Sequence, residues 1–258
     1  MEIIAISNQK GGVGKTTTTV NLAAALGRAG RKVLLVDLDP QASLTEYFMN
    51  AVEASARETV YNLLLGARRI DAVELGNMVG LLPASIDLAA AEVQLPSKLN
   101  GQAILARVLK NYSGNFDYCL IDCPPSLGIL TTNALTAAHW VIIPVATDLM
   151  AERTVKLILD TISEVKESGL NTALQVWQIL PTLYDARLNH HKEVLEALRY
   201  KHGSMLYEEP VKFTVKYKDS VTVRGDVSEL DKAQGEYWNR LAVNLLSSKM
   251  EFKLGAGA

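Results

Sequence analysis

The sequence predicts an α/β protein built on a doubly wound, mostly parallel sheet flanked by helices. Three observations lead to this prediction. Short apolar runs alternate with longer stretches of helical periodicity along the 258 residues. The runs are apolar almost throughout, which is typical of strands covered by helices on both faces. A glycine-rich segment directly follows the first run and opens the first helical stretch, as phosphate-binding loops do.

Each expected strand is separated from the next by a helical stretch or a long connection. The strands are expected at Ile3–Ser7, Val33–Asp37, Val79–Leu82, Tyr118–Asp122, Val141–Val145 and Leu174–Leu180. Helices are expected at Thr16–Ala29, Ala103–Asn111, Thr131–Ala138, Ala151–Ser168 and His190–Lys201. The stretch from Met49 to Leu75 also has a helical pattern. Right-handed crossovers place the carboxyl ends of parallel strands at one edge of the sheet, so motifs that follow strands should meet there.

The charge of the chain excludes a global basic field. Lys and Arg number 26 and Asp and Glu 28, which gives a net charge of -2 and a pI of about 6.1. Nucleic-acid binding would therefore need a local basic patch.

The cysteines, Cys119 and Cys123, are four positions apart, and no second pair follows. Neither a disulfide framework nor a zinc site is expected, so both are interpreted as small apolar residues packed around a buried strand. The N-terminus lacks the pattern of a signal peptide, and no apolar run approaches the ~18 residues of a membrane span. A reduced, cytoplasmic setting fits these observations.

The strongest motif is the run Lys10-Gly11-Gly12-Val13-Gly14-Lys15-Thr16-Thr17. Its small residues let the backbone wrap around an anion, and the helix that follows adds the positive end of its dipole. Lys15 can reach the β- and γ-phosphates of a nucleotide, the Thr16 hydroxyl can ligate Mg²⁺, and Thr17 adds a donor near the α-phosphate. The motif predicts binding of ATP and Mg²⁺. A glycine-rich turn with surface lysines is the alternative, and the strand and helix around the motif disfavour it.

Acidic residues close two of the expected strands. Asp37 and Asp39 end the second strand, beside the phosphate loop in this fold, although a solvated β-turn would use the same residue types. Asp122 ends a nearly all-apolar strand and is the candidate for contacting Mg²⁺, often through water. A merely strand-ending aspartate is the alternative there. Pro124 and Pro125 stiffen the turn that follows.

The phosphate loop departs from the ordinary P-loop pattern, and the departure resembles a known group. Gln9 stands where glycine is usual, and the extra lysine Lys10 follows it. This pattern resembles the deviant Walker A box of the ParA, MinD and nitrogenase iron protein group. The resemblance implies that Lys10 reaches across a nucleotide-sandwich dimer to the partner's phosphates. The run Asp37-Leu38-Asp39-Pro40-Gln41 resembles the ParA switch I box, which implies that Asp39 orients the attacking water and that Asp37 supports the Mg²⁺ shell. The following Pro40-Gln41 favours ParA over MinD.

The chain as a whole resembles the small ParA/Soj class without an N-terminal DNA-reading domain. The resemblance is dense from Met1 to Gln41 and from Phe116 to Val145, and it returns from Leu180 to Asn189. It implies a single P-loop ATPase domain over residues 1–250, which a flexible tail over residues 251–258 is expected to follow.

The implied function is ATP-dependent positioning. An ATP-state homodimer would bind double-stranded DNA non-specifically and partition DNA or another large cargo, with hydrolysis stimulated by a ParB-like or other adaptor. The implied location is cytoplasmic and nucleoid-associated. Two alternatives remain: a MinD-like membrane-cycling ATPase, and an electron carrier like the nitrogenase iron protein, for which Cys123 is poorly placed.

Three departures from the family pattern affect the nucleotide and DNA surfaces. His139 stands where an acid is usual, Ala146 replaces a common glutamine, and an unusual segment, 211–218, replaces an Arg-rich one. Alternation in that segment predicts an extended strand with lysines on one face. The candidate DNA contacts, mostly on resemblance, are Arg187, Lys212, Lys216, Lys218 and Arg224. Surface lysines that protect an edge strand are the competing account.

The last helical pattern runs from Tyr237 to Leu246. In MinD a terminal helix binds membrane, but this one has few basic residues, so packing on the core is expected and membrane binding is not. The pair His190-His191 is interpreted as a solvated helix start rather than a metal site.

Overall fold

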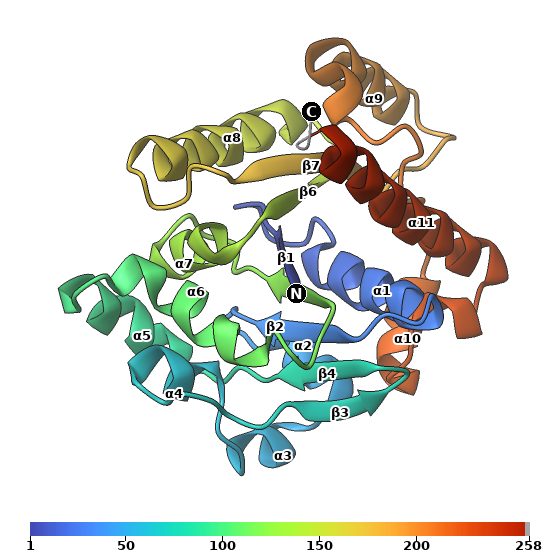
Figure 1. Cartoon of the computed structure of the whole chain (residues 1–258). Coiled ribbons are helices and arrows are strands. Elements are labelled where there is room, and N and C mark those ends of the chain that lie inside the picture. Colours follow the sequence, from blue (N-terminus) through green and yellow to red (C-terminus); the bar gives the residue numbers. More distant parts are fainter. Residues whose placement is uncertain (256–258) are drawn as a thin grey trace.

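The computed structural model describes residues 1–255 and confirms the predicted fold class. One sheet crosses the molecule in the order β3-β4-β2-β5-β1-β6-β7, and β3 alone runs antiparallel to its neighbour (Figure 1). The strands are β1 (Glu2–Ile6), β2 (Val33–Asp37), β3 (Val73–Gly76), β4 (Val79–Leu82), β5 (Tyr118–Asp122), β6 (Trp140–Ala146) and β7 (Gln175–Thr182).

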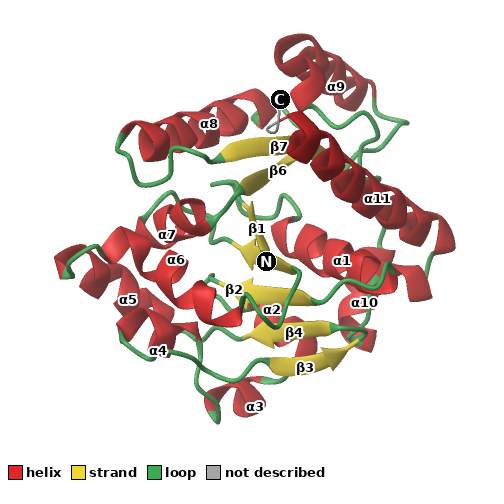
Figure 2. Cartoon of the chain, in the orientation of Figure 1, coloured by secondary structure: helices red, strands yellow, loops and turns green. Residues whose placement is uncertain are grey.

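Helices cover both faces of this sheet. Figure 2 shows α4 to α8 on one side of the strands and α1, α10 and α11 on the other. The α-helices are α1 (Lys15–Arg28), α2 (Ser43–Phe48), α3 (Ala51–Ser55), α4 (Val60–Leu65), α5 (Leu88–Gln94), α6 (Ile104–Leu109), α7 (Ile129–Ala137), α8 (Ala151–Glu167), α9 (Asn189–His202), α10 (Lys216–Val223) and α11 (Lys232–Gly255). Short 3-10 turns add η1 (Leu95–Ser97), η2 (Gly101–Ala103), η3 (Lys110–Tyr112), η4 (Gly203–Met205) and η5 (Val227–Glu229).

Two apolar cores, one on each face, explain the continuous apolar runs of the strands. Every residue of β2 and β5 is buried, because alternate side chains enter opposite cores. On the α1 side the core includes Trp238 and Leu241 of α11. The predicted packing of the last helix on the core is therefore confirmed. In the part of the chain that the structure describes, no helix combines the length and apolarity needed to cross a membrane.

The helical prediction from Met49 to Leu75 is wrong in part. That stretch contains α3 and α4 and then a strand, β3, whose burial alternates between half-buried and exposed. The hairpin joins β3 to β4 through Asn77 and Met78, whose φ angles are 46° and 64°. Because this turn lacks the usual glycine, the sequence carries no strong hairpin signal.

The predicted domain boundary at residue 250 stays a prediction. Helix α11 continues to Gly255, into the segment for which a flexible tail is expected. Residues 256–258 of that segment lie outside the described residues. Cys119 and Cys123 are free and buried, in agreement with the sequence interpretation, and burial raises the pKa of the Cys123 thiol to about 12.

Candidate nucleotide-binding site

The phosphate loop lies between the carboxyl end of β1 and the start of α1. Gly12 and Gly14 have φ angles of 72° and 87°, a region that L side chains rarely adopt. A Cβ atom at Gly12 would meet nothing within 4 Å, and one at Gly14 would lie 3.8 Å from Thr182. The loop therefore needs these glycines for its backbone conformation rather than for space. Gly14 is the residue from which α1 begins.

Lys15 is a buried lysine inside this loop. Its Nζ donates a hydrogen bond to the carbonyl oxygen of Lys10 at 3.0 Å. Burial lowers the pKa of the Lys15 ammonium, and the nearby Asp122 carboxylate opposes that shift. A buried ammonium whose protein partner is mainly a backbone carbonyl favours an additional anion, which suits the predicted contact with nucleotide phosphates.

Asp122 faces the start of α1 from the end of β5. Its Oδ2 accepts a hydrogen bond from the Thr16 hydroxyl at 2.7 Å, and its Oδ1 lies 3.4 Å from the Thr19 hydroxyl. Burial, with the neighbouring Asp37 carboxylate, raises the pKa of Asp122 to about 8. The Asp122 carboxyl group and the Thr16 hydroxyl form an oxygen pair that suits Mg²⁺, and a cation there would relieve the repulsion between the buried Asp122 and Asp37 carboxyl groups. The residues present therefore fit the predicted cation.

Asp37 is fully buried and lies opposite Asp122 in the register of the adjacent strands. Its Oδ2 accepts hydrogen bonds from the Thr45 amide at 2.8 Å and the Thr45 hydroxyl at 2.7 Å. Its Oδ1 accepts one from the Asp39 amide at 3.1 Å. Burial raises the pKa of Asp37 to about 7. These contacts fix the loop that follows β2 and the start of α2, so Asp37 acts on the site through its neighbours.

Asp39 is half-buried at the mouth of the site. Its Oδ1 accepts a hydrogen bond from the Gln41 amide at 2.9 Å, and both residues line the cavity above the phosphate loop. A little further along, Ala42 has a φ angle of 54° and precedes α2. Asp39 thus lies on a tight loop within reach of the cavity, a position compatible with the role in orienting water that the family resemblance implies.

Lys10 has a different environment from Lys15. Its Nζ lies 2.5 Å from Asp148 Oδ2, on the loop after β6, and about a third of its side chain is exposed. Among the described residues, those that line the cavity include Gly11, Gly12 and Lys15 but not Lys10. The two lysines of the motif are therefore separated: Lys15 lies within the loop of its own chain, and Lys10 lies beside it at the surface.

The cavity over the phosphate loop has a volume of about 510 Å³. Its far wall comes from the loop after β7 and from the segment between residues 211 and 221, which the sequence did not place at this site. Leu183 in that wall has a φ angle of 56°. The wall residues that sequence reasoning missed are Thr182, Leu183, Val211, Phe213, Thr214, Tyr217, Val221 and Trp238. They form a largely apolar and aromatic surface of the kind that takes a nucleobase.

The prediction that the lysines of segment 211–218 share one face of a strand is wrong. Lys216 and Lys218 lie in α10, and Lys212 forms only an isolated bridge with Tyr184. The segment forms a helix rather than a strand because Tyr217 and Ser220, which are three positions apart, both point toward the core. In addition, Lys216 pairs with Asp219 at 3.5 Å within the helix.

The candidate DNA residues therefore do not form a single row. Lys212 and Lys218 line the nucleotide cavity, and Lys216 and Arg224 are exposed on and just after α10. Arg187 is elsewhere, in a bidentate pair with Asp185 that holds the pKa of that carboxyl well below its usual range.

His139 replaces the usual acid and makes a structural contact of its own. Its Nδ1 accepts a hydrogen bond from the Ile3 amide at 2.9 Å, which ties the loop before β6 to β1. A carboxylate could accept the same bond, so this departure leaves the nucleotide site intact. The site is at the opposite ends of these strands.

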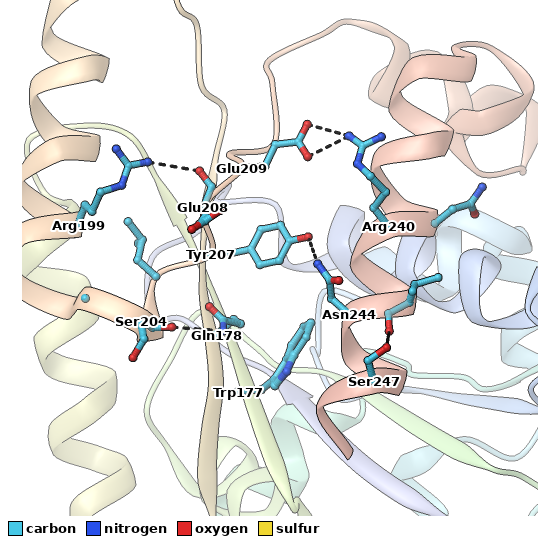
Figure 3. A pocket seen from close by; sticks show the side chains of 14 residues that line it. Trp177, Gln178, Arg199, Ser204, Tyr207, Glu208, Glu209, Arg240, Asn244 and Ser247 are labelled. Atoms are coloured by element: carbon cyan, nitrogen blue, oxygen red, sulfur yellow. Dashed lines mark hydrogen bonds and ion pairs between the residues drawn. The ribbon is translucent and has the colours of Figure 1, made fainter. Parts of the chain in front are cut away.

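A larger cleft of about 990 Å³ lies between β7, the end of α9 and α11, and Figure 3 shows its lining. Both of its arginines already have partners within the protein. Arg240 makes two hydrogen bonds to the Glu209 carboxylate, and Arg199 donates to the Glu208 carbonyl. None of the predicted site residues lines this cleft, so size alone does not identify the functional site.

Comparison with known proteins agrees with this geometry. The AAA_31 family model, an AAA domain, matches residues 1–176. The chain is 40% identical over 222 residues to the sporulation initiation inhibitor protein Soj of Bacillus subtilis, covering 85% of this chain and 87% of Soj. It is 39% identical over 228 residues to the chromosome-partitioning ATPase Soj of Treponema pallidum, covering 87% and 88%.

Solved structures agree as well. A Mycobacterium smegmatis protein named cobyrinic acid a,c-diamide synthase, with bound ADP and magnesium, superposes with a TM-score of 0.78 at 38% identity, covering 95% of this chain and 94% of that one. A putative plasmid partition protein from Borrelia burgdorferi bound to AMPPNP superposes with a TM-score of 0.79 at 25% identity, covering 96% and 99%. The sequence identity to the Soj proteins, together with the phosphate loop and its paired carboxylates, shows that the chain belongs to the ParA/Soj family of deviant Walker A ATPases.

Proposed function

We propose that this ATPase binds Mg²⁺–ATP in the cavity over the phosphate loop and then dimerises, with Lys10 of each protomer at the phosphates of the other. In that state it binds DNA non-specifically and positions DNA or another large cargo in the cytoplasm, over the nucleoid. A ParB-like or other adaptor stimulates hydrolysis and resets the cycle.

The observation that carries the proposal is the separation of the two lysines. Lys15 lies inside the loop, where its Nζ reaches the Lys10 carbonyl. Lys10 instead extends to Asp148 at the surface, outside the lining of its own cavity. A surface ammonium beside a phosphate site is available to a second protomer, whereas a buried one is not.

Exposed apolar side chains near this edge support a second copy as the partner. Leu149, next to the Asp148 that holds Lys10, is 88% exposed, and Met150 follows it. Ile86 and Val93 are also largely exposed on the connection after β4, which reaches the turn that follows β5 near Gly128. Exposed apolar groups around a polar site are typical of a surface that becomes covered.

The chemistry follows from the residues that line the cavity and from the two buried aspartates beside them. Thr16 and Asp122 would hold Mg²⁺, which neutralises charge on the β- and γ-phosphates when it is bound. Lys15 binds phosphate, Asp39 orients the attacking water, and Asp37 fixes the Asp39 loop through its amide. Lys10 of the other protomer stabilises the negative charge that develops on the ADP leaving group as the bond to the γ-phosphorus breaks.

Mixing two inactive variants tests the proposal. In a mixture of Lys10→Ala and Asp39→Ala chains, the mixed dimer contains one site with an intact Asp39 and a lysine supplied by the partner. That site should hydrolyse ATP, so the mixture should be active although each variant alone is not. If the lysine served its own chain, both sites of the mixed dimer would be defective and the mixture would stay inactive, which would reject the proposed dimer.

A further inference from the structure

Tyr47, at the end of α2, makes buried contacts with the C-terminal part of α10. Its phenol oxygen lies 2.6 Å from the Ser220 hydroxyl oxygen, and the phenol donates a hydrogen bond to the Gly225 carbonyl at 2.9 Å. Tyr47 is 5% exposed and Ser220 is fully buried. The contact joins residues 173 positions apart, so it connects two otherwise separate parts of the chain.

Helix α2 is held firmly to the loop that carries Asp39. The Thr45 amide and hydroxyl both bind the buried Asp37 carboxylate, whose other oxygen accepts from the Asp39 amide. The Thr45 hydroxyl oxygen also accepts a hydrogen bond from the Ala84 amide at 2.8 Å. Since α2 has only six residues, Thr45 and Tyr47 lie within one turn of each other. The loop itself is also bonded to α2, because the Ala42 amide donates to the Asp39 carbonyl at 2.8 Å and the Glu46 amide donates to the Ala42 carbonyl at 2.8 Å. Through these two bonds a displacement of Asp39 reaches the first turn of α2 and Tyr47 beyond it.

The segment that receives this contact is the end of the basic helix α10. Arg224 ends that helix with a φ angle of 53°, a conformation that is uncommon for a residue with a side chain, and Gly225 follows. Two contacts from α1 hold the chain just beyond. The Val227 amide donates to Asn21 Oδ1 at 2.9 Å, and Arg28 pairs with Asp226 at 2.8 Å. The end of α10 is thus held between the phosphate-loop helix and α2.

We propose that Tyr47 is a positioning residue that couples the Asp39 loop to the end of α10. The inference rests on the proposed function only in requiring that ATP and ADP place the Asp39 loop differently. Helix α1 supports the end of α10 in both nucleotide states, whereas α2 follows the loop that faces the γ-phosphate. The Tyr47 hydroxyl therefore carries the difference between the two states to Ser220 and Gly225, and so to Lys216 and Arg224.

Hydrogen exchange followed by mass spectrometry tests this coupling without DNA. In the parent chain, amide exchange over residues 220–227 should differ between a non-hydrolysable ATP analogue and ADP, both with Mg²⁺. Contacts with the base and ribose are the same for both nucleotides, so they cancel in this comparison. In Tyr47→Phe, the difference over residues 220–227 should be lost, while the difference over residues 39–42 should persist.

Two further variants make the result specific. Ser220→Ala removes the other hydroxyl of the contact and should reduce the difference in the same way. Tyr237→Phe is the matched control, because Tyr237 is buried in the same core but its hydroxyl donates to the Glu209 carbonyl. It should leave the difference unchanged. The inference would be overturned if the exchange difference over residues 220–227 persisted in Tyr47→Phe. It would also be overturned if the parent showed no such difference while residues 39–42 distinguished the ATP analogue from ADP.

The outcome can be separated from that of the proposed function. If residues 39–42 do not distinguish the analogue from ADP, the nucleotide switch itself fails and the coupling fails with it. If the parent does not bind DNA but the exchange difference depends on Tyr47, the coupling stands and only the DNA part of the proposed function is wrong.

Discussion

Lys10 Nζ lies 2.5 Å from Asp148 Oδ2 in the structure of the single chain. In the proposed dimer the same ammonium must lie at the partner's phosphates, so Asp148 competes with the partner for Lys10. The two side chains are 33% and 39% exposed, and exposed ion pairs contribute about 1 kcal/mol or less. The competition is therefore modest and reversible, as a cycling ATPase requires.

Weakening this pair should favour the dimer. Asp148→Asn keeps an oxygen for the hydrogen bond from the Met150 amide but removes the charge that holds Lys10. The fraction of dimer in ATP and Mg²⁺ should rise. Each protomer releases one such pair, so the dimer dissociation constant should fall by at most about thirtyfold, which corresponds to about 2 kcal/mol for the two pairs. Sedimentation velocity over a concentration series measures it. A weaker dimer would instead mean that Asp148 stabilises the interface directly.

Lys15 should be essential for nucleotide binding. Lys15→Ala removes a buried ammonium whose charge-assisted bonds to phosphate should contribute roughly 1.5–3 kcal/mol, so affinity for ATP should fall by more than about tenfold. Titration with a fluorescent ATP analogue measures the affinity, and circular dichroism checks the fold. Lys166→Ala, on the exposed surface of α8, is the control and should bind as the parent does. Unchanged affinity in Lys15→Ala would reject the cavity as the nucleotide site.

Asp39 should matter for hydrolysis and not for binding. Its carboxylate faces the cavity from the loop after β2, where its structural contact is to the Gln41 amide. Asp39→Ala should bind ATP normally, hydrolyse it about a hundredfold more slowly, and accumulate as a dimer on size-exclusion chromatography with ATP and Mg²⁺. Hydrolysis at the parental rate, or a variant that stays monomeric, would move the role to another group.

Much of the fold could be predicted because the strands are buried on both faces. The bounds of β2, β4 and β5 agree with the continuous apolar runs, and the acidic residues at the ends of β2 and β5 meet as parallel register requires. The edge strand β3 could not be recognised in the same way, because one of its faces is exposed. A strand of four residues with half-buried alternation resembles a short polar helix or loop.

The far wall of the cavity, formed by the loop after β7 and by residues 211–221, could not be predicted. It depends on contacts between residues that are distant in the sequence. The lysine alternation from Lys212 to Lys218 resembles a strand when read alone. The structure instead turns Tyr217 toward Trp238 and Ser220 toward Tyr47, and these contacts select the helix. Tertiary packing of this kind overrides the local sequence pattern. The aromatic residues Phe213 and Tyr217 were the sequence signal that one side of the segment is buried.

The stability of the nucleotide-free chain should fall as pH rises. Burial raises the pKa of Asp37 to about 7 and that of Asp122 to about 8, above the usual value of 3.8. Between the unfolded and folded pKa values the folded state binds more protons, so stability is greatest below the unfolded pKa and is lost as pH rises through about 7 to 8. The slope can reach about 1.4 kcal/mol per pH unit for each proton released.

Urea unfolding across this range, with and without Mg²⁺–ATP, measures the effect. Asp122→Asn cannot ionise at that position and should show a shallower decline than the parent. Bound Mg²⁺ should favour the ionised carboxylates and reduce the decline in the parent. Stability that rises with pH in the nucleotide-free parent would contradict the assignment of Asp37 and Asp122 as carboxyl groups that resist ionisation.

DNA binding should depend on ATP and on cations outside the nucleotide cavity. The chain is slightly acidic overall, so the patch of one protomer is weak, and two patches joined by the ATP dimer raise the effective concentration. Binding should ignore sequence and fall with salt, with a log–log slope of about -0.9 for each phosphate neutralised. Anisotropy with labelled duplexes over a salt series, in ATP and in ADP, measures both properties.

The structure determines which variants make that measurement interpretable. Lys212 and Lys218 line the cavity, so replacing them would change nucleotide binding as well as DNA binding. Lys216→Ala with Arg224→Ala removes exposed cations outside the cavity lining. The salt slope should flatten by about 0.9 for each DNA phosphate that the double variant no longer neutralises, while dimerisation persists. Lys166→Ala is the matched surface control.

Equal DNA binding in ATP and ADP would reject nucleotide gating. An unchanged slope in the double variant would instead place the DNA surface at Arg187, which would have to release Asp185 to reach a phosphate.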